Sequence, residues 1–150
     1  MNMPVANVKA LLVIASQLSG YPIPADGSMP VVQEVSRKQI AIDGCDATND
    51  LEVVMCGIIG ITDEDGNIEV DAQSTTEPDA SKSLNAVTVH ELTHWLQVKN
   101  HRDFANRGQC PDRFLVEYEA YKAEVEYQIA YEHKPVPDFI LIPPTVCPLK

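Results

Sequence analysis

Residues 90–94 read His90-Glu91-Leu92-Thr93-His94, within a segment that we expect to form a helix from about Leu84 to Asn100. Two residues four positions apart on a helix lie about 40° from each other round the axis, on one face and one turn apart. Two neutral imidazoles placed in this way can bind one Zn²⁺ together. The spacing therefore predicts a zinc site to which His90 and His94 contribute ligands.

Glu91 follows the first histidine and lies about 100° round the helix from it. Its carboxylate is therefore expected beside the metal rather than bound to it. From there it can accept a proton from water activated by the metal and pass that proton to a leaving amine. Val89, Leu92 and Leu96 form a separate apolar stripe that we expect to face the core. The pattern thus predicts two ligands and one general base, and the alternative is a solvated surface pair of histidines.

The third ligand has to come from another part of the chain. Neither remaining histidine fits, because His101 lies seven residues after His94 and His133 is expected at the solvent-facing end of a helix. A carboxylate from the next helix, expected from Asp112 to about His133, leaves a fourth metal position open for water. That arrangement is typical of catalytic zinc, whereas structural zinc is usually closed by thiolates.

Four glutamates on this second helix are candidates, and their angles round the helix separate them only weakly. They are Glu117, Glu119, Glu124 and Glu126. Ala120, three residues after Glu117, is small and allows the two helices to approach each other closely. We therefore expect Glu117 to be the third ligand, with Glu119 and Glu124 as the alternatives.

Taken together, the two motifs resemble those of the gluzincin zinc peptidases. In that clan two histidines and a glutamate from the following helix bind zinc, and a Glu-x-x-Ala pattern there matches Glu117 to Ala120. The clan often continues with Asp or Asn, which supports a ligand histidine, where this chain has Tyr121. The resemblance implies a minimal zincin core without the extra lobe of thermolysin. Tyr121 or Tyr118 is then a candidate to support the site or to stabilise the oxyanion.

The chain is also similar to small bacterial and phage-encoded proteins with a His-Glu-Leu-x-His-x-Leu-Gln segment and a Glu-x-Glu-Ala-Tyr helix, over about Val5 to Tyr131. From these motifs we expect a zinc-dependent hydrolase, and more narrowly a metallopeptidase that acts on a peptide or protein substrate. The rival interpretation is a structural or regulatory zinc-binding protein of phage or bacteria without significant turnover. The intact Glu91 favours the enzyme, because a structural site needs no base beside the metal.

The rest of the chain predicts an α+β domain in which a short, mostly antiparallel sheet packs on the two zinc-bearing helices. Val53–Thr62 is apolar and β-branched, as in a buried strand, and Asp65-Gly66 marks a hairpin turn. The return strand, Asn67–Asp71, alternates apolar with polar residues and is expected at the sheet edge, where a substrate strand can add. The other predicted elements are a helix over Val5–Ser19, a strand over Val31–Val35, a short helix from Ser36 to Ile42 and a loop over Gln73–Ser83.

Length and charge restrict the function further. A chain of 150 residues is expected to form a single domain, 1–150, with a proline-rich tail, 134–150, packed on it. The net charge of −11 repels phosphate, so we expect no nucleic-acid partner. The apolar run Ala10–Ala15 is too short for a membrane span and makes a poor signal peptide. We therefore expect no membrane partner and a cytoplasmic location, with secretion left open.

Four cysteines, Cys45, Cys56, Cys110 and Cys147, are widely spaced and form no Cys-x-x-Cys pair. This spacing argues against a zinc ribbon. An even number of cysteines permits two disulfides, and buried reduced thiols are the alternative in a cytosolic protein. The sequence leaves both open, with Cys110 as the expected partner if disulfides form.

Overall fold

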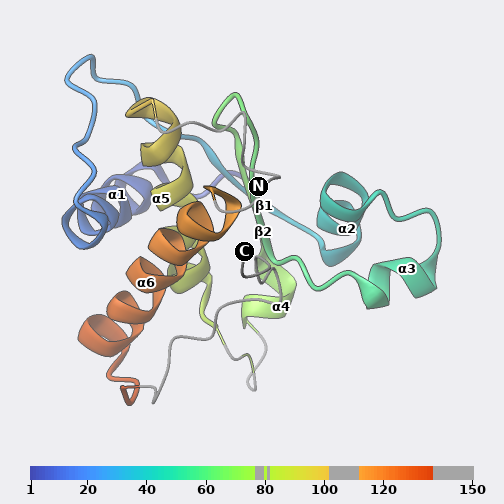
Figure 1. Cartoon of the computed structure of the whole chain (residues 1–150). Helices are drawn as coiled ribbons and strands as arrows, with labels where there is room; N and C mark the ends of the chain where they lie inside the picture. The colour runs from blue at the N-terminus through green and yellow to red at the C-terminus, as the bar shows by residue number, and fades with distance from the viewer. Residues whose placement is uncertain (77–79, 81, 102–111, 137–150) are drawn as a thin grey trace, which may run out of the picture.

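The computed structural model describes residues 1–76, 80, 82–101 and 112–136, which form an α+β fold (Figure 1). The expected fold class and the short sheet are confirmed, and so is the predicted helix over Val5–Ser19. In this part of the chain the elements are α1 (Val5–Ser19), β1 (Val32–Val35), α2 (Arg37–Cys45), α3 (Asp50–Met55), β2 (Gly60–Thr62), β3 (Ile68–Asp71), α4 (Ala72–Thr76), α5 (Leu84–Lys99) and α6 (Asp112–Glu132).

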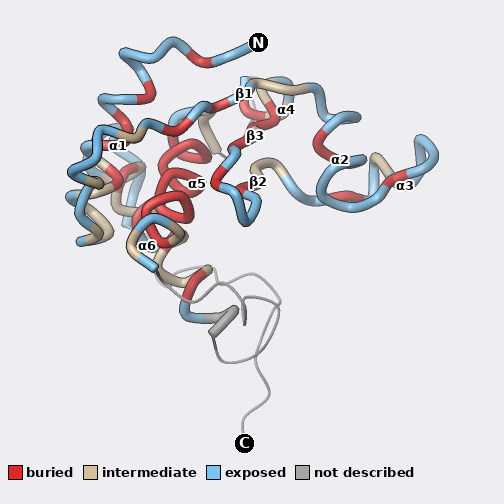
Figure 2. Tube along the Cα trace, turned by 90° about the horizontal axis from the view of Figure 1, so that it is seen from above, coloured by how far each residue is buried: buried red, intermediate tan, exposed pale blue. Residues whose placement is uncertain are grey.

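Helix α5 is the centre of the fold, because it contacts α1 and α6 and also the strands β2 and β3. The Ser83 hydroxyl caps its first turn by accepting a hydrogen bond from the backbone N–H of Ala86. Every residue from Ala86 to Gln97 is buried, and Figure 2 shows this stretch as an almost unbroken red helix. The buried stretch includes polar and ionisable side chains, which are costly inside a protein unless they are paired. The middle of α5 therefore carries a candidate functional site.

The sheet has the strand order β1-β3-β2. Strand β1 pairs with β3 in parallel, whereas β2 and β3 are antiparallel and are joined by the predicted hairpin turn. The carboxylate of Asp63 accepts hydrogen bonds from the backbone N–H groups of Asp65 and Asn67. Gly66 has a φ of 85°, a conformation that glycine adopts without steric cost. These contacts fix the register in which β2 faces β3.

The prediction that Asn67–Asp71 forms an edge strand is wrong. Strand β3 lies between the other two strands, and Ile68, Val70 and Asp71 are all buried. A sequence that alternates apolar with polar residues does not reveal whether a strand from far earlier in the chain, here β1, adds to the second edge. Substrate addition at this strand is therefore excluded. Within the described residues, the edge nearest to α5 belongs to β2.

Two other predicted segments differ from the structure. Val53–Thr62 is a strand only over Gly60–Thr62, because the side chain of Asn49 caps α3 and a helical turn extends to Met55. The expected loop over Gln73–Ser83 begins as the short helix α4, where the carboxylate of Asp71 accepts hydrogen bonds from the backbone N–H and the hydroxyl of Ser74. In both places a hydrogen bond that caps a short helix decides the local structure, although the composition of the longer segment predicts a strand or a loop.

A disulfide joins Cys45, the last residue of α2, to Cys56, which follows α3. The alternative of reduced thiols therefore does not hold for this pair. The other two cysteines, Cys110 and Cys147, and all but three residues of the expected tail lie outside the described residues, so the expected partnership of Cys110 does too. None of the helices in the described part of the chain combines the length and the hydropathy of a membrane-spanning segment.

Candidate metal centre

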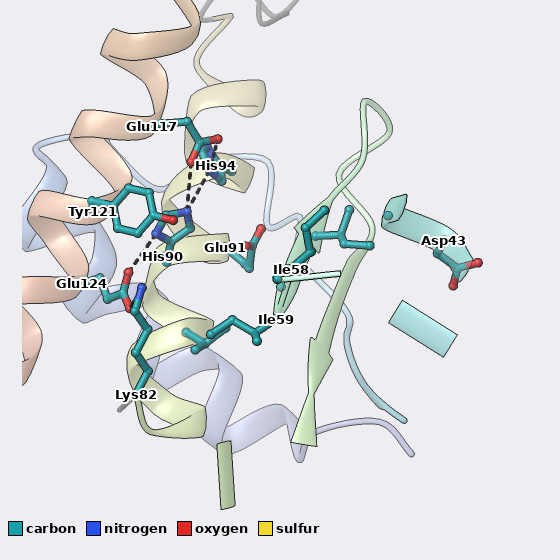
Figure 3. A pocket seen from close by; sticks show the side chains of 15 residues that line it. Asp43, Ile58, Ile59, Lys82, His90, Glu91, His94, Glu117, Tyr121 and Glu124 are labelled. Atoms are coloured by element: carbon teal, nitrogen blue, oxygen red, sulfur yellow. Dashed lines mark hydrogen bonds and ion pairs between the residues drawn. The ribbon is translucent and has the colours of Figure 1, made fainter. Parts of the chain in front are cut away.

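Helices α5 and α6 pack side by side and bring His90, His94 and Glu117 together (Figure 3). His94 Nε2 lies 3.2 Å from His90 Nε2 and 3.2 Å from Glu117 Oε1, and His90 Nε2 lies 3.4 Å from Glu117 Oε2. Ligand atoms bound at tetrahedral angles to one Zn²⁺, each about 2.0–2.1 Å from it, are about 3.3–3.4 Å apart. The three separations therefore match the edges of a tetrahedral zinc site.

The contacts of Gln97 determine which nitrogen of the neutral His94 ring carries the proton. The amide nitrogen of Gln97 donates to the Val116 carbonyl at 3.1 Å and to Glu119 Oε2 at 3.0 Å, and both partners are acceptors. The amide oxygen of Gln97 must therefore face His94 Nδ1, 2.8 Å away. Nδ1 of His94 is consequently the donor in that bond. In the neutral ring this assignment leaves the lone pair on Nε2, the atom that faces His90 and Glu117.

Glu124 holds the outer nitrogen of His90. Its Oε2 lies 3.0 Å from His90 Nδ1, and its Oε1 lies 2.9 Å from the ammonium of Lys82. Burial raises the pKa of Glu124, but the hydrogen bond from His90 and the positive charges of His90 and Lys82 lower it by more, so the pKa stays below its ordinary value. An ionised Glu124 can only accept a hydrogen bond, so Nδ1 of His90 is a donor as well.

When both imidazoles are neutral, two lone pairs and one carboxylate converge between the helices. Burial opposes the charge of His90, but hydrogen bonds with Glu117 and Glu124 raise its pKa to about 9. Burial likewise opposes ionisation of Glu117, yet contact with His90 and His94 keeps its pKa well below the ordinary value. Acceptors packed this closely need a proton or a cation among them. The group can hold a metal ion, with donor atoms that suit zinc.

Glu91 is not part of this group, and its carboxylate lies beside it on the side of the sheet (Figure 3). It is only 4% exposed, and the Thr62 hydroxyl lies 2.7 Å from its Oε2. Its other carboxylate oxygen lies against the backbone of β2 at Gly60. Glu91 therefore borders the group that could hold a metal without being one of its members.

Tyr121 lies edge-on to the imidazole of His90, with 4.4 Å between the ring centroids. The ammonium of Lys82 lies over the tyrosine ring, 4.6 Å from its centroid. Burial and the negative charges of nearby glutamates raise the pKa of Tyr121 to about 12. The phenol is thus neutral at physiological pH and can donate a hydrogen bond. The carboxylate that contacts His90 Nδ1 belongs to Glu124, three residues after Tyr121 on the same helix.

A cavity of about 820 Å³ opens over the three candidate ligands. Helices α5 and α6 form one wall, to which Glu91, Tyr121 and Lys82 also belong (Figure 3). The facing wall comes from the end of α2, from the segment that leads into β2 and from β2 itself. It consists of one acidic residue and of small and branched residues, namely Asp43, Gly44, Gly57, Ile58, Ile59, Gly60 and Ile61. The site is therefore open to a molecule much larger than water.

The remaining candidates lie elsewhere. Glu119 accepts hydrogen bonds from Gln97 and from Tyr21, and Glu126 pairs with Lys122 in solvent. Neither His101 nor His133 belongs to the metal-binding group. Sequence reasoning missed Thr62, Lys82 and Gln97 as parts of the site. Only Gln97 carried a signal, since a residue three positions after His94 shares its helix face.

Comparison with protein-family models, with curated protein sequences and with solved structures found no match to this chain. The resemblance to gluzincins thus continues to rest on the two motifs alone.

Proposed function

We propose that this chain is a zinc-dependent hydrolase, and more narrowly a metallopeptidase. The observation that carries the proposal is the convergence of His90 Nε2, His94 Nε2 and the Glu117 carboxylate at 3.2–3.4 Å, with Glu91 beside them in a cavity. Two imidazoles and one carboxylate are a typical ligand set of catalytic zinc, which keeps its remaining position for water or substrate. When bound, the metal supplies a Lewis acid that activates water and polarises a carbonyl group.

The residues around the metal would then have separate roles in the reaction. Glu91 accepts the proton of the attacking water and delivers it to the leaving amine, as general base and then general acid. Tyr121, neutral and beside His90, donates a hydrogen bond to the oxygen on which negative charge develops. Glu124 and Gln97 hold the two imidazoles so that both Nε2 atoms face the metal.

A peptide is the substrate that the surroundings of the site suit best. The cavity has a volume of about 820 Å³. Among the described strands, β2 pairs only with β3, so its other edge has no partner strand. Backbone groups of Gly60–Thr62 beside Glu91 can therefore pair with an extended chain. The Ile58, Ile59 and Ile61 side chains offer apolar contacts to it.

The rival proposal, a structural or regulatory zinc-binding protein without turnover, explains the ligands equally well. It gives no role to a buried glutamate beside the metal or to an open cavity. Zinc-loaded protein should be incubated with a library of fluorogenic peptides, in parallel with Glu91→Gln and the partly exposed control Glu126→Gln. Cleavage that the control keeps and Glu91→Gln loses supports the peptidase. Bound zinc with no cleavage of any peptide supports the rival.

A further inference from the structure

We propose that Thr62 is a positioning residue for Glu91, whose hydroxyl holds one carboxylate oxygen so that the other is left for proton transfer. The inference rests on the proposed role of Glu91 as the base and adds the means by which this base is held. Thr62 is the last residue of β2, and Glu91 lies on α5. The contact therefore joins the sheet to the helix that carries the two histidines.

The hydrogen bond itself is short and buried. Thr62 Oγ1 lies 2.7 Å from Glu91 Oε2 and 3.1 Å from the backbone oxygen of Glu91. A threonine hydroxyl has one proton, and its contact with the carboxylate oxygen is the shorter of the two, so the hydroxyl donates to the carboxylate. Thr62 is 2% exposed, so water has little access to replace it. The bond fixes a side chain that is otherwise free to rotate about several single bonds.

The backbone of Gly60 restricts the same carboxylate from another direction. A Cβ atom at this position would lie 2.6 Å from Glu91 Oε1 and 2.8 Å from its Cγ. The carboxylate thus lies flat against β2, with Oε2 bound by Thr62 and Oε1 next to a residue without a side chain. Gly60 and Glu91 both line the cavity. Oε1 is therefore the oxygen that remains to accept a proton from water in the cavity.

Proton transfer is sensitive to this geometry. A general base has to lie within about 2.6–3.2 Å of the atom that carries the proton, and a misplacement of about 1 Å can cost 10²-fold in rate. Loss of the Thr62 hydroxyl should therefore lower the rate of the catalytic step, kcat, without weakening metal binding or substrate binding.

The test compares zinc-loaded wild type with Thr62→Val, Thr62→Ala and Thr62→Ser. Val keeps the shape of the side chain, Ala avoids a methyl group against the carboxylate, and Ser keeps the hydroxyl. Both variants without a hydroxyl should lose about 10- to 100-fold in kcat, with KM and zinc content unchanged, and Ser should restore most of the rate. Thr88→Val is the control, because Thr88 is a buried threonine of α5 whose hydroxyl bonds the Leu84 carbonyl outside the cavity.

Two further measurements separate positioning from general damage. In a Glu91→Gln background, Thr62→Val should add no further loss, because both changes act through one carboxylate. Crystal structures of the metal-free proteins should show the Glu91 carboxylate turned away from Gly60 in Thr62→Val and Thr62→Ala, but not in Thr62→Ser. Wild-type kcat in Thr62→Val, or an unmoved carboxylate, overturns the proposal. Failure of the proposed function looks different, because wild type itself then cleaves nothing while the crystal structures still decide whether Thr62 holds Glu91.

Discussion

Glu124 Oε2 lies 3.0 Å from His90 Nδ1, on the opposite side of the imidazole from Glu117. The sequence predicts Glu124 only as an alternative ligand whose removal leaves the metal nearly intact. In the structure its carboxylate contacts the outer nitrogen of a proposed ligand, and partners of that kind are worth about 10- to 100-fold in metal affinity. Glu124→Ala should therefore weaken zinc binding by that factor in a competition assay with a chromogenic chelator. Glu126→Ala should bind zinc as wild type does, and equal affinities in both variants would refute the role.

Removal of a proposed ligand should have a larger effect than removal of its partner. The purified protein is expected to hold about one Zn²⁺ per chain, and His90→Ala, His94→Ala or Glu117→Ala should each lose most of it. Metal content after dialysis, measured by plasma mass spectrometry, checks this. Glu126→Ala is the matched control on the same helix, because its carboxylate pairs with Lys122 instead of with a residue of the site. A fully loaded Glu117→Ala variant would show that the third ligand is another residue.

Zinc affinity should depend on pH through His90. Burial opposes the charge of this ring, but Glu117 and Glu124 raise its pKa to about 9 in the metal-free protein. Zinc must displace that proton, so affinity should rise about tenfold for each pH unit between pH 7 and 9 and then level off. The charged ring stabilises the metal-free fold fully below its unfolded pKa of about 6.5, and that contribution disappears as the pH rises through 9. Chelator competition across this pH range measures how steeply zinc affinity rises with pH. The control His101→Ala should show the same dependence as wild type.

Gly60→Ala should disturb the base and leave the metal in place. The new Cβ would lie 2.6 Å from Glu91 Oε1, so the carboxylate has to move. We expect kcat to fall by about 10²-fold with unchanged zinc content. Gly57→Ala is a close control, since Gly57 also lines the cavity and a Cβ there meets nothing within 4 Å. Equal rates for the two alanine variants would mean that Glu91 has room to move.

Reduction of the Cys45–Cys56 disulfide should destabilise the protein. Eleven positions separate the two residues along the chain, and closing a loop of this length contributes about 2–3 kcal/mol in the chain-entropy account. Helix α3 lies inside the loop and has no buried residue of its own, so few other contacts hold it. Urea unfolding of the Cys45→Ser/Cys56→Ser variant should show the loss. A midpoint equal to that of wild type would mean that packing alone fixes the loop.

The sequence was sufficient for those parts of the fold in which local signals agree. Helices α1 and α5 follow from apolar spacing and from their ends, Gly20 and Ser83. The pair of strands around Gly66 follows from turn chemistry. The central position of β3 could not be predicted from local signals. Its parallel pairing with β1 joins segments more than 30 residues apart, and no local pattern encodes such a pairing.

The candidate site divides in the same way. His90, Glu91 and His94 follow from spacing on one helix, and Ala120 favoured Glu117 on the next. Thr62 and Lys82 could not be found, because they reach the site from a strand and from a loop whose approach depends on tertiary packing. The contact between Glu124 and His90 could not be predicted, since helix angles locate a side chain to one face but do not say which side of an imidazole it contacts.

The burial of α5 has a consequence for the life of the protein in a cell. Two of the three candidate ligands, His90 and His94, are buried residues of the central helix, and the third comes from the neighbouring helix α6. The unfolded chain therefore has no comparable site, and zinc bound there would act as a folding ligand. By mass action, each tenfold excess of free zinc over its dissociation constant adds about 1.4 kcal/mol to the unfolding free energy. Zinc starvation would then shorten the half-life of the protein in addition to abolishing its activity. The degradation rate would rise as the zinc supply falls.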